Sequence, residues 1–147
     1  MKYQFLTEAQ RSALNVYVKL MRSTNRATRE IHRHLQEDNL THSQFAVLEA
    51  LFHLGPLSQG ELCQRILKSN ANLTTVVDGL EKKALVKRDR SPHDRRLVTV
   101  SLTAAGEELI ARVFPRHAEA VERQFAVLSD KEQSELAGLL KKLGRGE

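Results

Sequence analysis

The stretch NANLTTVVDGLEKKALVKRDRSPHDRRLVTVSL, residues 70–102, decides the fold. Its first part predicts a helix over about 70–83, because Leu73, Val77 and Leu80 recur at the spacing of one helical face. Polar residues lie between them, so this helix has one side for a core and one side for solvent or a partner.

Two short β-prone segments follow this helix. Residues 97–102 alternate between apolar and polar side chains, which predicts a strand with one buried face. Residues 85–88 are also β-prone, and the polar segment between the two contains the turn signal Ser91-Pro92. Together they predict a hairpin with a charged tip, a wing over about 87–97.

Two short helical patterns precede this region. One follows Thr41 and stops at Gly55-Pro56, and the other begins at Ser58. A short polar turn joins the second of them to the helix at 70–83, which is the arrangement of a helix-turn-helix.

Longer helical patterns occupy both ends of the chain. One covers about 8–38, which is long enough to suggest that it reaches another helix layer or another subunit. The other begins after Thr103, and we expect a kink or short break at Pro115, because proline removes a helical N–H. The last helix is expected to end before Gly144. Four capping boxes mark helix starts at Thr7–Gln10, Thr41–Gln44, Ser58–Glu61 and Ser129–Glu132.

The expected fold class is therefore mainly α with a small β-hairpin wing, a winged helix-turn-helix with six helices. The 147 residues fit one domain. The formal net charge is +5 and the pI is near 9.6, and the basic excess is concentrated in residues 61–100. Such a balance is typical of nucleic-acid-binding domains.

Other classes of protein find little support in the sequence. There is no apolar signal peptide and no segment apolar enough to span a membrane, so we expect a soluble, cytoplasmic protein. No catalytic motif, dinucleotide fingerprint or Walker loop is present, so we do not expect an enzyme or a cofactor.

The helix at 70–83 opens with short polar side chains, which is what base edges and phosphates in a major groove require. Asn pairs with adenine, and the Thr methyl group packs on thymine. The alternative is that these residues only cap the helix or face solvent. The candidate recognition residues are Ser69, Asn70, Asn72, Thr74 and Thr75.

The wing supplies basic side chains beside that helix. Arginine on a projecting hairpin can enter the narrow, electronegative minor groove, and Asp94 is placed to hold a neighbouring arginine through a bidentate pair. The alternative is a solvated hairpin whose charges discourage aggregation. The candidate wing residues are Arg88, Arg90, Asp94, Arg95 and Arg96.

These motifs resemble the multiple-antibiotic-resistance regulator (MarR) family. The segments that carry the resemblance lie in order along nearly the whole chain: 40–48, 57–62, 72–86, the Asp-Arg-Arg at 94–96, and Ser-Leu-Thr-Ala-Ala-Gly at 101–106. Ala84 departs from the family, which usually has glycine there. Because a left-handed cap costs more for alanine, we expect the preceding helix to end differently in this chain.

The resemblance implies a regulator, usually a repressor, that binds an inverted-repeat operator in double-stranded DNA as an intertwined homodimer, in which the N- and C-terminal helices of the two copies intertwine. It implies dimerisation helices at about 1–38 and 104–147 and a winged-helix DNA-binding region at about 41–103. The recognition helix, about 70–83, would enter the major groove, and the wing, about 87–97, the minor groove. Asp94 and Arg96 match the Asp-x-Arg pair of the family's wing. The resemblance also implies release from DNA by a small aromatic or anionic ligand.

The sequence bears on three kinds of regulatory site: a ligand pocket, an oxidant-sensing cysteine and a metal site. The family's ligand pocket would be formed by His32, Phe45, His53, Phe114 and His117, although an aromatic core explains the same residues. Cys63 shares a helical face with Ile66 and is read as a core residue rather than an oxidant sensor. The histidines lack the spacing of a zinc site, so no metal is expected. The main alternative function is a winged-helix module that binds only protein.

Overall fold

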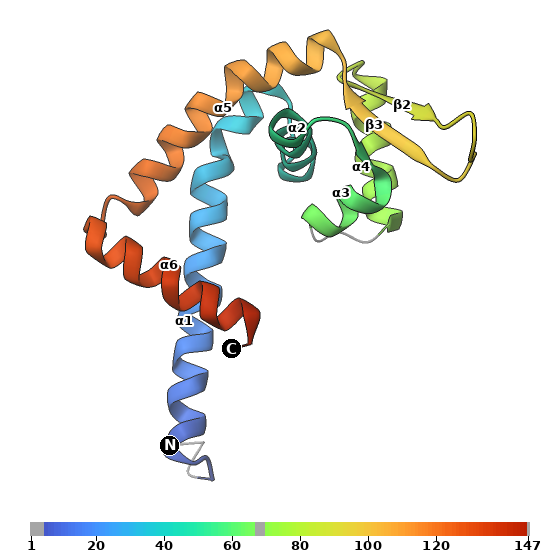
Figure 1. Ribbon diagram of the computed structural model, residues 1–147. Coiled ribbons are helices and arrows are strands. Elements are labelled where there is room, and N and C mark those ends of the chain that lie inside the picture. The colour runs from blue at the N-terminus through green and yellow to red at the C-terminus, as the bar shows by residue number, and fades with distance from the viewer. Residues whose placement is uncertain (1–4, 67–69, 147) are drawn as a thin grey trace. The chain divides into compact units, whose positions relative to one another are not determined.

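Six α-helices, one 3-10 helix and three short strands form the part of the chain that the computed structural model describes, residues 5–66 and 70–146 (Figure 1). The chain divides into two compact units. The terminal unit comprises Met1–Arg33 and Ala120–Glu147, and the central unit comprises His34–Glu119. The expected fold class and the number of helices are confirmed.

The terminal unit contains α1 (Glu8–His32), the last turns of α5 (Ala104–Phe125), and α6 (Asp130–Arg145). Thr7 and Ser129 form the predicted capping boxes at the starts of α1 and α6. These helices leave much of their apolar surface exposed: α1 has one buried residue, Ile31, and α6 has none. The exposed apolar side chains include Leu14, Val16, Tyr17, Val18, Met21, Leu139, Leu140 and Leu143.

The central unit is built from short helices around a small sheet. Its elements are the end of η1 (Arg33–Asp38), α2 (His42–Leu54), β1 (Leu57–Ser58), α3 (Gln59–Ile66), α4 (Asn70–Lys82), β2 (Val86–Arg90), β3 (Val98–Leu102) and the first part of α5. Apolar residues from these elements form one core: Leu35, Phe45, Val47, Leu48, Leu62, Leu73, Val77, Leu80, Val86, Val100, Ile110 and Val113 are each at most 2% exposed. The capping boxes at Thr41 and Ser58 are also confirmed.

The sheet is antiparallel, in the order β1-β3-β2. Val86 pairs with Leu102 at the base of the hairpin, and Arg90 pairs with Val98 nearer its tip. Figure 1 shows this hairpin extending beyond the helices of the central unit, as the wing prediction required. β1 was not predicted: Leu57 pairs with Val100, so the wing strands form two of three strands rather than an isolated hairpin.

The long helices differ from the sequence prediction in three details. The predicted helix at 8–38 is α-helical only to His32 and continues as the 3-10 helix η1. Of the kink or short break expected at Pro115, the break is absent, because α5 continues through this residue. Buried Val113 before the proline and ion-paired Arg116 after it hold the helix on both sides. Finally, α6 passes Gly144 and is capped by Gly146 in the left-handed region.

The expectation that α4 would avoid a left-handed cap is wrong. Ala84 has φ +55°, and the N–H groups of Ala84 and Leu85 donate to the carbonyl oxygens of Glu81 and Leu80. Thr103 Oγ1 donates to the Ala84 carbonyl oxygen at 2.6 Å. Burial of Leu85 and this hydrogen bond fix the conformation despite the steric cost to a β-carbon.

None of the helices in residues 5–66 and 70–146 combines the length and apolar character needed to cross a membrane.

Candidate nucleic-acid interface

The exposed face of α4 carries polar side chains that were predicted to read DNA. Asn72, Thr74 and Thr75 are exposed, whereas Leu73 is fully buried in the core of the central unit. The polar side of α4 is therefore exposed and its apolar side faces the core, as the sequence pattern predicted. Asn70 is the first residue of α4, and Ser69 lies outside the described residues.

The start of α3 contacts this face of α4 through Gln59. Its amide Nε2 donates a hydrogen bond to Thr74 Oγ1 at 2.8 Å, and the Gln59 residue is half-buried. The position of Gln59 is set by the adjacent capping box, in which the Glu61 carboxylate accepts from the Ser58 N–H at 2.8 Å. Hydrogen bonds from the Ser58 backbone and side chain lower the pKa of Glu61, and Arg65 contributes in the same direction.

Arg88, at the centre of β2, is folded against α4. Its Nη1 lies 2.6 Å from Asp78 Oδ1 and 3.4 Å from Glu81 Oε1, and its Nη2 donates to the carbonyl oxygen of Thr74 at 3.2 Å. The Arg88 N–H also donates to Glu81 Oε2. The side chain is only 20% exposed. This position differs from the projecting wing arginine that the sequence predicts, and it ties the wing to α4.

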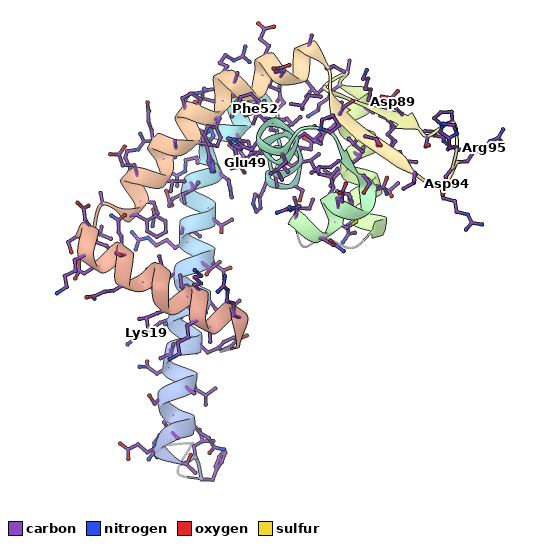
Figure 2. All side chains as sticks on the ribbon, in the orientation of Figure 1. Lys19, Glu49, Phe52, Asp89, Asp94 and Arg95 are labelled. Carbon is purple, nitrogen blue, oxygen red and sulfur yellow. The ribbon has the colours of Figure 1, made fainter. Side chains whose placement is uncertain are left out.

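The tip of the wing is closed by short hydrogen bonds. Asp94 Oδ1 accepts from the N–H of Arg96 at 2.9 Å, and the Leu97 N–H donates to the Asp94 carbonyl oxygen at 3.0 Å. The contact of Asp94 is thus with the backbone of Arg96, rather than the guanidinium pair that was expected. Figure 2 shows the Arg95 side chain directed away from the hairpin, and Arg90 and Arg96 are also exposed. The wing therefore presents three arginines to solvent.

The predicted ligand pocket corresponds largely to a cluster of rings. Ring centroids are 4.5 Å apart for Phe45 and His117, and 4.8 Å apart for His53 and Phe114. His34, which the sequence reading did not include, lies 5.7 Å from His117. Burial lowers the pKa of His117, and the nearby imidazoles of His34 and His42 lower it further. His32 is the last residue of α1 and belongs to the terminal unit.

An open groove of about 400 Å³ lies elsewhere in the central unit. It is lined by one face of α2 and the end of α3: His42, Ser43, Ala46, Glu49, Ala50, His53, Leu54, Arg65 and Ile66. Only His53 is shared with the predicted pocket, because Phe45 is 1% exposed and belongs to the core. Cys63 packs against that core, as expected.

Sequence reasoning missed the residues that hold the reading face in place. Gln59 and Asp78 attracted no attention, because a single polar residue on an amphipathic helix has no distinctive spacing. Their roles depend on which element lies opposite, and the hydrogen bond of Gln59 spans 15 positions of the chain. A basic residue in β2 facing acidic residues at the end of α4 was the one available signal.

Comparison with known proteins agrees with this geometry. The model of the MarR family matches residues 40–98, which include α3, α4 and most of the wing. The chain is 34% identical over 144 residues to YkoM, an HTH-type transcriptional regulator of Bacillus subtilis (strain 168), covering 98% of this chain and 94% of YkoM. It is 33% identical over 132 residues to the HTH-type transcriptional regulator MhqR of the same organism, covering 90% and 91%.

A solved structure supports the same relationship. BpsR of Bordetella bronchiseptica, whose DNA binding is regulated by 6-hydroxynicotinic acid, superposes with a TM-score of 0.82 at 27% identity, covering 88% of this chain and 98% of BpsR. The similarity extends over both the winged helix and the terminal helices. The chain belongs to the MarR family of HTH-type transcriptional regulators.

Proposed function

We propose that this regulator binds an inverted-repeat operator as a homodimer, with α4 in the major groove and the wing in the minor groove of each half-site. The observation that carries the proposal is the exposed polar face of α4 beside a wing with three exposed arginines. Residues about 41–103 would form the DNA-binding region, and helices within about 1–38 and 104–147 would form the dimer. The protein would act in the cytoplasm, as a repressor.

The reading of bases is assigned to α4. Asn72, Thr74 and Thr75 offer an amide, hydroxyl groups and methyl groups, which are suited to base edges in the major groove. Asn70, the first residue of α4, and Ser69 before it in the sequence are assigned the same role from the sequence alone. The N–H groups at the start of a helix also favour a nearby phosphate.

The wing is assigned to the minor groove. Arg90, Arg95 and Arg96 are exposed, and the Asp94 carboxylate holds the backbone of the tip. A narrow minor groove has an enhanced negative potential that attracts such side chains. Arg88 is assigned to the support of α4 instead, because its guanidinium is occupied by Asp78 and Glu81.

The homodimer is supported by the exposed apolar side chains of the terminal unit. Leu14, Val18 and Met21 of α1 are each more than 40% exposed, as are Leu139 and Leu143 of α6. Isolated apolar side chains on a surface are ordinary, but such a concentration on two helices indicates an interface. A two-fold dimer then requires half-sites about one DNA turn apart, or a multiple of that distance.

Release by a small ligand is part of the same proposal. The groove along α2 is lined by Arg65, His42 and His53, by one carboxylate, Glu49, and by the apolar side chains of Leu54 and Ile66. Its basic and apolar groups together suit an aromatic acid. It provides a more open site than the ring cluster around His117.

The experiment is selection of bound sequences from random duplex DNA by the full-length protein, at two salt concentrations. Enrichment of an inverted repeat is expected, and loss of affinity with salt should report the phosphate contacts. Binding without sequence preference, or none, would contradict the proposal and favour a module that binds only protein. Adding candidate aromatic acids to the complex with the selected sequence then tests release.

A further inference from the structure

One residue of the candidate recognition face is held from two sides. The side chain of Thr74 accepts a hydrogen bond from Gln59 Nε2 of α3 at 2.8 Å. The main-chain carbonyl oxygen of the same residue accepts from Arg88 Nη2 of β2 at 3.2 Å. Thus α3, which precedes α4 in the chain, and β2, which follows it, both contact Thr74.

The hydrogen bond from Gln59 selects a side-chain conformation. Threonine in a helix divides between two χ1 rotamers, which exchange the places of its hydroxyl and methyl groups. A donor at a fixed position beside Oγ1 favours the rotamer that keeps the oxygen there. The two groups are read differently by DNA, since a hydroxyl group bonds to base edges whereas a methyl group packs on thymine.

The contact from Arg88 fixes the backbone under that side chain. Its guanidinium reaches Thr74 while it is held by Asp78 and Glu81, one and two turns further along α4. A guanidinium presents several donors in one rigid plane, so it can hold these groups at once in a fixed arrangement, whereas an ammonium group is a point charge on a flexible stem. The same contact offsets two carboxylates that would otherwise lie uncompensated beside a polyanion.

We infer that Gln59 and Arg88 are positioning residues for sequence reading, which fix the rotamer and the backbone of Thr74 and thereby determine the base pair preferred at one position of each half-site. The inference rests on the proposed function, because it requires Thr74 to face a base edge. It assigns to Arg88 a role in specificity without any contact with DNA.

The test compares base preference rather than overall affinity. Full-length dimers of wild type, Thr74→Val, Gln59→Met and Arg88→Lys are titrated with the selected operator and with its variants at each position. Thr74→Val identifies the base pair in question, because it removes the hydroxyl group and keeps the shape. Gln59→Met removes the amide without adding charge, and Arg88→Lys keeps the charge but loses the planar fork.

Gln59→Met and Arg88→Lys are each expected to reduce discrimination at that base pair about tenfold, close to the effect of Thr74→Val. The double variant Gln59→Met/Thr74→Val should discriminate no worse than Thr74→Val alone, since each change removes the same hydrogen bond between these two side chains. Gln64→Met, the same substitution at an exposed position of α3, is the matched control and should retain the preference. The salt dependence should be unchanged throughout.

Three other outcomes are distinguishable. If Thr74→Val changes the preference but Gln59→Met and Arg88→Lys lower affinity equally for all sequences, the inference is overturned and the proposed function stands. If Thr74→Val leaves every preference intact, the assignment of Thr74 and this inference both fail. If wild type selects no sequence, the proposed function fails first. Thermal unfolding identifies a variant that does not fold, and Gln59→Asn, which keeps the amide but shortens its reach, then replaces Gln59→Met.

Discussion

The carbonyl oxygen of Leu85 occupies the space beside Gly106, so that a β-carbon on Gly106 would lie only 1.9 Å from it. Gly106 is in the first turn of α5, and its N–H donates to Thr103 Oγ1 at 3.1 Å. The start of α5 is therefore in backbone contact with Leu85, the third residue after the end of α4. This contact joins the segment that ends α4 to the helix that leads out of the wing.

Gly106→Ala is expected to lower the free energy of unfolding by about 3 kcal/mol or more, because the backbone of Leu85 would have to move. Denaturant unfolding followed by circular dichroism measures the change. Gly60→Ala in α3 is the control: its new β-carbon would meet only Ser58 Oγ, at 4.0 Å, so the higher helix propensity of alanine should leave stability equal or greater. Equal stability of wild type and Gly106→Ala would contradict the contact.

Ala84→Gly is expected to raise the free energy of unfolding by about 1 kcal/mol. Ala84 has φ +55°, a region that costs an L-residue with a β-carbon about 1–2 kcal/mol. The gain from glycine is smaller than this cost, because glycine has more conformational entropy than alanine in the unfolded chain. Thermal and denaturant unfolding measure the gain. Ala118→Gly, in the exposed middle of α5, should show the opposite sign, with a loss of about 1 kcal/mol. A loss at both positions would argue against the left-handed cap.

Asp38→Asn is expected to destabilise the central unit by about 1–2 kcal/mol. The Asp38 side chain is only 10% exposed and is paired with Arg112 at 3.2 Å and with Arg116, so the neutral amide would remove the negative charge that faces Arg112 and leave Arg116 with the exposed Glu37. Glu37→Gln is the matched control, because Glu37 pairs with Arg116 at 2.8 Å but is 72% exposed. It should cost less than about 0.5 kcal/mol. Equal losses of stability in the two variants would contradict the larger contribution expected of the nearly buried Asp38.

The stability of the central unit should depend on pH through His117. Because the pKa of His117 is lowered in the folded protein, the unfolded chain binds a proton more readily, and stability should be complete above the usual pKa near 6.5. It should fall as the pH drops from there through the folded pKa. His117→Phe, which can pack on Phe45, should flatten this fall, because it removes the imidazole whose pKa is lowered. An unchanged profile in urea unfolding between pH 7.5 and 5 would contradict the role of His117.

Arg96→Gln is expected to weaken operator binding about tenfold, and to lessen the slope of log affinity against log salt by about one unit if Arg96 neutralises one phosphate. Binding isotherms at several salt concentrations measure both quantities. Lys131→Gln on α6, where Lys131 is paired only loosely with Glu135 at 3.9 Å, removes the same charge far from the wing in sequence. It should leave the slope as it is, and a similar loss in both variants would indicate a general charge effect.

The helix starts could be predicted from the sequence, because their signals are local. Thr41 and Gln44 are three residues apart, and each makes its hydrogen bond within one turn whatever lies beyond. Strand β1 could not be predicted in the same way. Leu57-Ser58 has only two residues, and its partner Val100 lies far along the chain.

The candidate interface was predictable in composition but not in orientation. The helical spacing of Leu73, Val77 and Leu80 indicated the buried side of α4, and so placed Thr74 and Thr75 on the exposed side. The sequence showed the charge of Arg88 but not the direction of its side chain, because that direction depends on Asp78 of α4 lying opposite it. The continuation of α5 through Pro115 also depends on tertiary contacts, since local propensity alone favours a break.

The nearly unburied terminal helices have a consequence for how the regulator responds to its own abundance. With one buried residue in α1 and none in α6, these helices obtain little stability from their own chain. In the proposed homodimer the second copy supplies it, so that assembly and folding of this unit are linked by mass action. Below the dissociation constant of the dimer, the concentration of the dimer, the form that binds the operator, then rises with the square of the total protein concentration. A twofold change in expression would alter promoter occupancy more steeply than a monomeric regulator could.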